Sequence, residues 1–423
     1  MKKILLTIFS LLLSVAFVSA SGSQEEGNSS GPVEVEFWTM QLSPTFDDYI
    51  NGTIAAFEAE NPGIKVKWVD VPWGDMETRI LTAAASGDMP DVANMNPHFA
   101  QKLAQLDALL DMEKWAADVK DQYFRGSWDA NKFGGKTFGL PWYLATPVLF
   151  YNKALFEEAG LDPENPPTTY EEVFTAAEQI SRTTGKYGYM PVLSNHAVME
   201  EVEKAGIRLF NEDFTKASFA RSEIVDFAKA YKDMIERKII PAQSLNEGSG
   251  TAIQMFSAGE IAMFNGGTSH AGMIKNNSEA TYAVTGVGAQ PMGPQGKTNV
   301  AVMNIAVAAG TKYPEEAVKF AKFITNGPNQ VEFSIVAGAI VPSIAGAEKS
   351  DFFTVSDGTA AAEARIISAA QVKEAQVIFP PMTNFSDVKD AFLNAFQKSL
   401  LEEGDIMNNF IAAEAEANRA LAQ

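Results

Sequence analysis

The sequence predicts an α/β fold made of two doubly wound α/β lobes, joined by a hinge that the chain crosses several times. First, predicted strands and helices alternate from residue 33 to residue 95, as in a doubly wound sheet. Second, an apolar run at residues 146–151 breaks this order. Third, the Pro/Gly loop at residues 290–296 and the AIVPSIAGA segment at residues 339–347 both lie away from the middle of the chain. Two lobes that exchange chain more than once explain these positions.

The first predicted elements form a strand followed by a helix. Residues 33–38 (VEVEFW) alternate between apolar and acidic side chains, which is the period of a strand with one wet face. In the next segment Ile50, Ile54 and Phe57 recur at the spacing of an amphipathic helix, and an Asn-Pro-Gly sequence ends it. A second strand (64–69), helix (75–88) and short strand (91–95) then repeat the pattern.

The second half of the chain contains further helices and strands. Thr169 and Glu172 form a capping box at the start of a helix, because each side chain can accept a hydrogen bond from the other residue's backbone N–H. We found no internal repeat at a fixed period. The remaining predicted strands are 186–193, 261–265 and one on each side of the Pro/Gly loop, and the remaining predicted helices are about 199–210, 222–237, 251–257, 313–326, 386–401 and 405–421.

The N-terminus has the pattern of a secretory signal. A charged start, a short apolar core and small residues up to Ala20 predict a signal peptide over residues 1–20. Residues 21–32 contain no aliphatic or aromatic side chain and predict a flexible tether. Ser21 stands where a bacterial lipoprotein would carry its lipidated cysteine, and the chain contains no cysteine at all. We therefore expect an exported, periplasmic protein without a lipid anchor at that site and without disulfides.

Composition and motifs exclude several function classes. The net charge of -20 and the lack of a basic stripe argue against a nucleic-acid partner. The three histidines lack the spacing of a zinc site, no phosphate-binding loop follows a strand, and GTSHA at residues 267–271 lacks the last glycine of a hydrolase elbow. We therefore predict no catalytic residue, metal or cofactor, and we interpret His98, His196 and His270 as surface or polar-cluster residues.

Aromatic and amide side chains gather where the predicted strands end. Ligands of open α/β sheets bind outside the carboxyl ends of the strands, so these side chains are candidates for one shared crevice. An indole offers a flat apolar face to a sugar ring, and amides offer donors and an acceptor to hydroxyl groups. The alternative is that the tryptophans belong to the core. The candidates from this pattern are Trp38, Gln41, Trp73, Asn94, Trp142 and Tyr143, with Asn96, Asn195 and Asn304 as weaker candidates that could equally be loop-capping amides.

The segment VLFYNKALFEE, residues 148–158, resembles the signature of family 1 extracellular solute-binding proteins of ABC importers, the sugar-binding group that includes maltose-binding protein. It matches at Val148, at the Tyr-Asn pair 151–152, at Phe156 and at Glu158, and it departs at Tyr143, where a small residue is usual. The resemblance extends from about residue 33 to the C-terminal helices. Supporting segments are AAFEAENPGIKVKW, TAAASGDMPDV, GLDPENPPTTYEEV and GEIAMFNGG.

This resemblance implies a fold like that of type II periplasmic binding proteins, with a ligand in the cleft and closure on binding. It places lobe 1 at residues 33–143 plus about 292–343, and lobe 2 at residues 144–291 plus about 344–423. It also implies a monomeric, non-enzymatic receptor that delivers a neutral sugar or oligosaccharide to an ABC importer permease. Contacts from the second lobe are expected near Gly267, and Thr268 occupies the position of a sugar-stacking tryptophan of the family.

Two other functions remain open at this stage. A secreted glycosidase would have a similar cleft, with a pair of carboxylates about 5 to 10 Å apart across the bond that it cleaves. A binding protein for another solute, such as a polyamine or an organic anion, would have carboxylates or arginines converging in the cleft.

Overall fold

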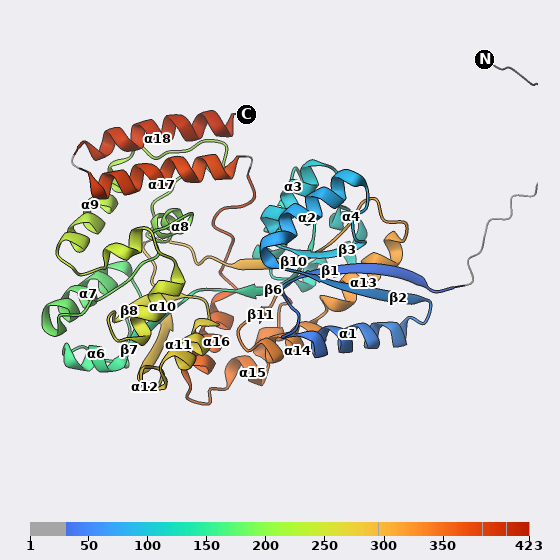
Figure 1. Ribbon diagram of the computed structural model, residues 1–423, viewed down its shortest axis with the longest axis horizontal. Coiled ribbons are helices and arrows are strands. Elements are labelled where there is room, and N and C mark those ends of the chain that lie inside the picture. The colour runs from blue at the N-terminus through green and yellow to red at the C-terminus, as the bar shows by residue number, and fades with distance from the viewer. Residues whose placement is uncertain (1–30, 295, 383, 403, 423) are drawn as a thin grey trace, which may run out of the picture.

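The computed structural model describes residues 31–294, 296–382, 384–402 and 404–422. The predicted signal peptide and nearly all of the predicted tether lie outside these residues. Figure 1 shows two bodies side by side, each made of a sheet and its helices. We call the body with the six-stranded sheet lobe 1 and the body with the three-stranded sheet lobe 2.

The sheet of lobe 1 combines strands from the two ends of the chain. Its order is β11-β6-β10-β3-β1-β2, with β1 parallel to both β2 and β3 and with β10 antiparallel to both β3 and β6. The strand β10 therefore joins the N-terminal strands to β6. The strands are β1 (Val33–Met40), β2 (Ile64–Val71), β3 (Val92–Met95), β6 (Leu140–Ala145), β10 (Ala301–Val307) and β11 (Val341–Pro342).

Helices cover both faces of this sheet (Figure 1). On one face Phe37 packs edge-on against Phe320, at 5.1 Å between ring centroids, within a core that α1, α13 and α14 complete. On the other face α2 and α3 enclose a smaller core that includes Met76 and Leu103. The helices and small strands of this lobe are α1 (Asp47–Glu60), α2 (Trp73–Ser86), α3 (Pro97–Gln105), α4 (Met112–Trp115), η1 (Ala117–Gln122), α5 (Arg125–Asp129), β4 (Lys132–Phe133), β5 (Lys136–Thr137), α13 (Pro314–Ile324) and α14 (Gly327–Ala337).

Lobe 2 has a sheet of order β8-β7-β9, in which β7 is antiparallel to both neighbours. Its main core lies under α7, α9 and the two C-terminal helices, which pack on each other and on α9 (Figure 1). The elements are β7 (Val148–Asn152), α6 (Lys153–Glu158), α7 (Tyr170–Thr184), α8 (Ala197–Lys204), α9 (Ser222–Glu236), η2 (Ala242–Leu245), α10 (Ser249–Ser257), β8 (Met263–Gly266), α11 (His270–Asn277), α12 (Glu279–Ala283), β9 (Thr285–Ala289), α16 (Ala360–Gln371), α17 (Phe385–Leu401) and α18 (Ile406–Leu421).

The chain passes between the lobes at several points. Residues 146–147 connect β6 of lobe 1 to β7 of lobe 2, residues 290–300 return to β10, and the chain after β11 leads through η3 (Ala347–Lys349) and α15 (Asp351–Thr354) to α16. At the first crossing the Oγ1 of Thr146 lies 2.9 Å from the Oγ of Ser368, and both side chains are fully buried. The chain thus leaves the sheet of lobe 1 after β6 and enters the sheet of lobe 2 at β7, close to the predicted crossing.

Two local predictions differ from the structure. Residues 186–193 form no regular strand; Tyr187 makes a single parallel bridge to Ile261. A Cβ at Gly188 would lie 2.2 Å from the backbone of Ala177, so this segment lies against α7, and on its other side the backbone N–H groups of Tyr187 and Met190 donate to the carbonyls of residues 260 and 263 at the start of β8. The helix predicted at about 199–210 is the shorter α8, and the sequence reading did not identify α14 or α16.

Candidate functional site

A cavity of about 330 Å³ lies between the lobes. Residues from α2 and α3 of lobe 1 form one wall, residues from α8 and the start of α17 form the other, and the crossing segment before and within β10 forms the floor. The lining residues are Trp73, Asn96, Pro97, His98, His196, Glu200, Asn299, Val300, Ala301, Val302, Met303, Val377, Phe379 and Phe385.

The lobe 1 wall is built at the carboxyl ends of β2 and β3. Trp73 begins α2, its side chain is 47% exposed, and its backbone N–H donates to Oε1 of Gln41 over 3.3 Å. Asn96 precedes α3 and its Oδ1 accepts a hydrogen bond from the backbone N–H of Phe99 over 2.9 Å. Asn96 therefore has the capping role that was the alternative to ligand binding, but its side chain also lines the cavity. Within the described part of the chain its amide nitrogen has no hydrogen-bond acceptor, so it can donate to a ligand.

The lobe 2 wall contributes the charged groups of the cavity. His196 lies just before α8, and its Nε2 is 3.5 Å from Oε1 of Glu200 in the first turn. Burial raises the pKa of the Glu200 carboxyl, whereas Lys204, His196 and a hydrogen bond with Asn299 act in the opposite direction. Burial thus makes the negative charge of Glu200 more costly than it is in water.

The two walls touch through a pair of rings. The imidazole of His98, on α3, stacks on the phenyl ring of Phe385, the first residue of α17, with centroids 5.7 Å apart and planes within 11°. Burial lowers the pKa of His98, and the nearby His196 and Lys102 lower it further. This contact closes one side of the cavity with a neutral, apolar pair.

A second cavity, of about 540 Å³, adjoins the first on the outside of this ring pair. It shares His98, His196 and Phe385 with the first cavity. Asn195 is exposed at this rim, with a φ of 56° that asparagine tolerates better than most residues. The structure thus brings Trp73 and Asn96 together in one cavity and places Asn195 at its edge.

The other predicted tryptophans pack inside lobe 1. Trp38 is 6% exposed, its Nε1 donates to Oε1 of Glu36 over 2.6 Å, and the guanidinium of Arg79 lies 4.3 Å from its ring centroid. Trp142 is fully buried and stacks on Phe333 at 4.9 Å. Neither lines the interlobe cavity, and both take the alternative role of core residues.

Tyr143 also packs inside lobe 1 and does not line the cavity. Its ring meets that of Phe333 edge-on, at 5.4 Å between centroids. Burial raises the pKa of its hydroxyl.

The two central amides are buried in the sheet. The Nδ2 of Asn94 donates to the carbonyl of Asn304 over 3.2 Å, and the Nδ2 of Asn304 donates to Oδ1 of Asn131 over 2.6 Å. Both candidates are fully buried, and neither lines the cavity. Each keeps a buried Oδ1 without a hydrogen-bond partner in the described structure.

The glycine turn after β8 does not line the cavity either. The hydroxyl of Thr268 donates to the carbonyl oxygen of Ala339, which follows α14 of lobe 1. Gly267 stands beside it, before α11. These residues form a second contact between the lobes.

Sequence reasoning missed most of the lobe 2 wall. His196, Glu200 and Phe385 come from a loop and two helix starts that share no strand-end pattern. A signal did exist for His98, because it lies two residues after Asn96, at the exit of β3. In the described part of the chain there is no group of His, Asp and Glu that could hold a metal ion. Among the described residues, no helix is long and apolar enough to cross a membrane.

Two α/β lobes with several chain crossings and a ligand-sized cavity between them define a solute-binding protein. The sequence profile of bacterial extracellular solute-binding proteins matches residues 43–331, and the chain belongs to this family. The fold is the one that the sequence predicted, similar to type II periplasmic binding proteins.

Three named relatives align with between 43% and 92% of the chain. The cyclic alpha-maltosyl-1,6-maltose binding protein of Arthrobacter globiformis has the same fold, with a TM-score of 0.78 over 92% of this chain and 99% of its own, at 22% identity. The diacetylchitobiose binding protein of Streptomyces coelicolor is 23% identical over 76% of this chain and 78% of its own. An arabinooligosaccharide-binding protein of Halalkalibacterium halodurans is 28% identical over 43% of this chain and 42% of its own.

Proposed function

We propose that the protein is an extracytoplasmic carbohydrate receptor that passes a sugar or oligosaccharide to an ABC importer by closing its two lobes. The observation that carries this proposal is the interlobe cavity, which combines an exposed indole, Trp73, with amide groups and with phenyl rings from the other lobe. Stacking on an aromatic face and hydrogen bonding to amides are the interactions that a polyhydroxylated ring offers. The names of the relatives support the same class of ligand.

The proposed mechanism is closure around the ligand. Lobe 1 would comprise residues 33–143 and about 292–343, and lobe 2 residues 144–291 and about 344–423, with rotation absorbed at the crossings. A ligand shifts the population toward the closed state only if that state adds contacts. Glu200, His196 and Phe385 on lobe 2 are the side chains that would add them to a sugar held first by Trp73 and Asn96.

The cavity offers less support to a glycosidase. Hydrolysis of a glycosidic bond requires two carboxyl groups flanking it. Among the described residues that line the cavity, Glu200 is the single carboxylate. We therefore propose a binding protein that is not an enzyme and that acts as a monomer.

A thermal-shift screen against a panel of mono- and oligosaccharides tests this function. A ligand that binds the native state stabilises it by mass action, by about 2.7 kcal/mol when the ligand concentration is a hundred times Kd, and this raises the temperature of the unfolding midpoint. We expect at least one sugar to do so without being consumed. Release of shorter sugars from an oligosaccharide would establish a glycosidase instead, and stabilisation by amino acids or organic anions alone would establish another solute.

A further inference from the structure

Helix α8 carries three carboxylates near the cavity, and two of them are neutralised inside lobe 2. Glu201 pairs with Lys204 and accepts a hydrogen bond from the hydroxyl of Tyr170 over 2.5 Å. Glu203 pairs with Arg208 over 2.7 Å and accepts from the backbone N–H of residue 209 over 2.6 Å. These two carboxylates therefore have internal partners.

Glu200 differs from its two neighbours because it lines the interlobe cavity. Its close ionisable neighbour is the imidazole of His196, which is half exposed and whose Nε2 is 3.5 Å away. The cation of Lys204 lies one turn further along α8 and is already bound to Glu201. Burial raises the pKa of Glu200, which indicates that its negative charge is incompletely compensated.

The described residues that line the cavity include no lysine and no arginine. Two lysines stand at the rim, and each already has an acidic partner. Lys102 pairs with Glu77, and the Nζ of Lys389 lies 3.0 Å from Oδ1 of Asp390. Glu200 is therefore the one acidic side chain among the described residues that line the cavity, no lysine or arginine there opposes it, and burial lowers the pKa of His98 on the lobe 1 side.

The aromatic side chains that line the cavity also favour a cationic ligand over an anionic one. Trp73, Phe379 and Phe385 present rings to the cavity, and the faces of aromatic rings attract cations and repel anions. A carboxylate and aromatic faces without an opposing lysine or arginine form a site for a cationic or neutral solute. An anionic solute would meet a like charge without compensation.

On the basis of the proposed function, we infer that Glu200 determines which sugars are accepted: the cleft binds sugars that carry a protonated amine in preference to neutral sugars, and it rejects sugars that carry a carboxylate or a phosphate. The ammonium group of such a sugar donates to the Glu200 carboxylate while its ring stacks on an aromatic side chain of the cavity. Such a pair supplies a cationic partner where the described lining residues include no lysine or arginine.

Three disaccharides of matched size test this inference by calorimetry at about pH 6, where an amine is protonated. They are the fully deacetylated chitosan disaccharide, neutral cellobiose and a disaccharide containing glucuronate. We expect the wild-type protein to bind the amine at least about 10-fold more tightly than cellobiose, and the glucuronate at least about 10-fold more weakly. We expect Glu200→Gln to bring the three affinities within about threefold of one another, because the amide has no charge.

The matched control is Glu212→Gln, which removes an exposed carboxylate of lobe 2 outside the cavity and leaves the order of affinities unchanged. Should Glu200→Gln fail to fold, the salt dependence of the wild-type protein tests whether a charge pair with the amine forms at all. Raising NaCl from about 20 to about 500 mM weakens binding of the amine but not of cellobiose if a charge pair forms.

The possible results separate this inference from the proposed function. A wild-type preference for cellobiose or for the glucuronate, or an unchanged order in Glu200→Gln, overturns the inference. So does binding of other neutral sugars with no binding of these three. A protein that no sugar of the wider panel stabilises overturns the proposed function itself.

Discussion

The imidazole of His98 and the phenyl ring of Phe385 lie parallel, 5.7 Å apart, although the two residues belong to different lobes. One comes from the start of α3, at the exit of β3, and the other opens the C-terminal helix pair. Such aromatic pairs contribute about 0.5–1.5 kcal/mol beyond the area that they bury. The stack therefore favours the arrangement in which the lobes meet.

The first prediction is that Phe385→Ala shifts the protein toward an open arrangement. Removing about 0.5–1.5 kcal/mol from the closed state weakens sugar binding by about 2- to 13-fold. The radius of gyration without ligand should increase, and saturating ligand should reduce it to the wild-type value. Scattering profiles measured with and without sugar check both parts. An unchanged radius in both states, with a sugar shown to be bound, would indicate a rigid binding domain.

The second prediction concerns Trp73, the exposed indole of the cavity. By analogy with bases stacked on aromatics, at about 1–3 kcal/mol per ring, Trp73→Ala should weaken affinity by roughly 5- to 150-fold. Trp142→Phe serves as the control, because that ring is fully buried in the core and its loss should alter stability more than affinity. Titration of both variants with the same sugar measures their affinities. Normal binding by Trp73→Ala would show that the ligand does not stack on this ring.

The third prediction is that His270 makes the protein sensitive to acid. Its Nδ1 is buried without a hydrogen-bond partner among the described residues and its ring stacks on Phe264, and burial lowers the pKa of the imidazole to about 4. The unfolded chain takes up this proton near pH 6.5, so the native state binds fewer protons between these values and stability falls as pH falls through this window. We expect the loss to approach about 3 kcal/mol by pH 4.

Urea unfolding at pH 7 and at about pH 4 measures this effect. The variant His270→Gln should show a smaller loss between the two values, since glutamine does not titrate. Equal losses in the wild-type protein and the variant would assign the acid sensitivity to other groups.

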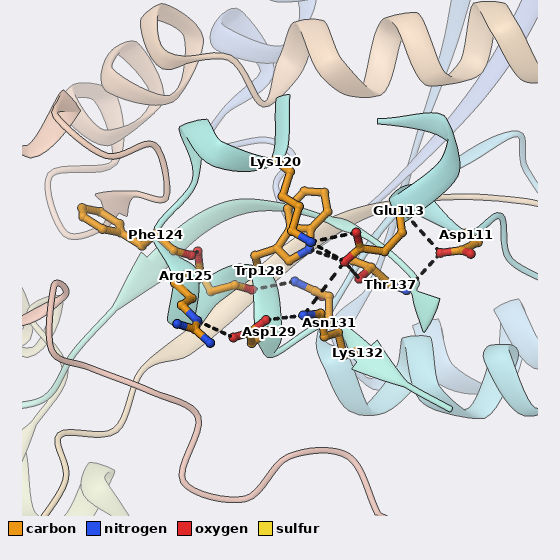
Figure 2. Close-up of polar contacts among 11 residues, drawn as sticks. Asp111, Glu113, Lys120, Phe124, Arg125, Trp128, Asp129, Asn131, Lys132 and Thr137 are labelled. Carbon is orange, nitrogen blue, oxygen red and sulfur yellow. Dashed lines mark hydrogen bonds and ion pairs between the residues drawn. The ribbon is translucent and has the colours of Figure 1, made fainter. Parts of the chain in front are cut away.

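The fourth prediction concerns a polar network that holds the small helices of lobe 1 together. Figure 2 shows Glu113 among Lys120, Trp128 and Thr137. Its Oε1 accepts from Nε1 of Trp128 over 3.0 Å, and its Oε2 lies 2.8 Å from Nζ of Lys120. The hydrogen bond from Lys120 is the main cause that lowers the pKa of this carboxyl to about 2, with that from Trp128 next.

Because this folded-state pKa lies below the unfolded value, Glu113 stabilises the fold above about pH 4.5, and that contribution is lost as pH falls toward 2. The side chain is 28% exposed, so solvent screening reduces the effect to about 1 kcal/mol. Glu113→Gln should lower the free energy of unfolding at pH 7 but leave it unchanged at pH 2. The control Glu60→Gln, at an exposed position, should leave it unchanged at both pH values. A destabilisation of equal size at both pH values would show that packing, and not charge, is responsible.

The fifth prediction is export with cleavage after Ala20. The exported protein should begin at Ser21 and carry no lipid, because position 21 has no thiol to acylate. Intact-mass spectrometry of protein recovered from the periplasm checks this. An intact Met1 end or a lipid adduct would contradict the prediction.

The fold was predictable because its signals are local. The strand β1 was predicted from the alternation of apolar and acidic residues at 33–38. The helix α1 was predicted from the helical spacing of Ile50, Ile54 and Phe57, and both elements are present. The crossing into lobe 2 was predicted from the apolar run at residues 146–151, which interrupts the alternation of strands and helices. In contrast, α14 has few periodic apolar positions, and its local signals were the capping residue Asn326 and the C-terminal Gly338, which the sequence reading did not use.

The candidate site was only partly predictable. Strand-end reasoning identified Trp73 and Asn96 because both stand just after strands whose carboxyl ends meet at one edge. The same reasoning included Trp38 and Asn94, which lie inside strands, so the pleat directs their side chains into the core. Glu200 and Phe385 reach the cavity through the relative position of the two lobes, which no local pattern records.

The position of β10 in the sheet of lobe 1 has a consequence for synthesis of the chain. This strand lies between β3 and β6, yet residues 301–307 leave the ribosome after most of lobe 2. Until then the N-terminal strands and β6 have no common neighbour, so the first lobe cannot complete its fold in the order of translation. Pairings between such distant segments form slowly. The sheet of lobe 1 can therefore be completed only after about 300 residues of the chain have been made.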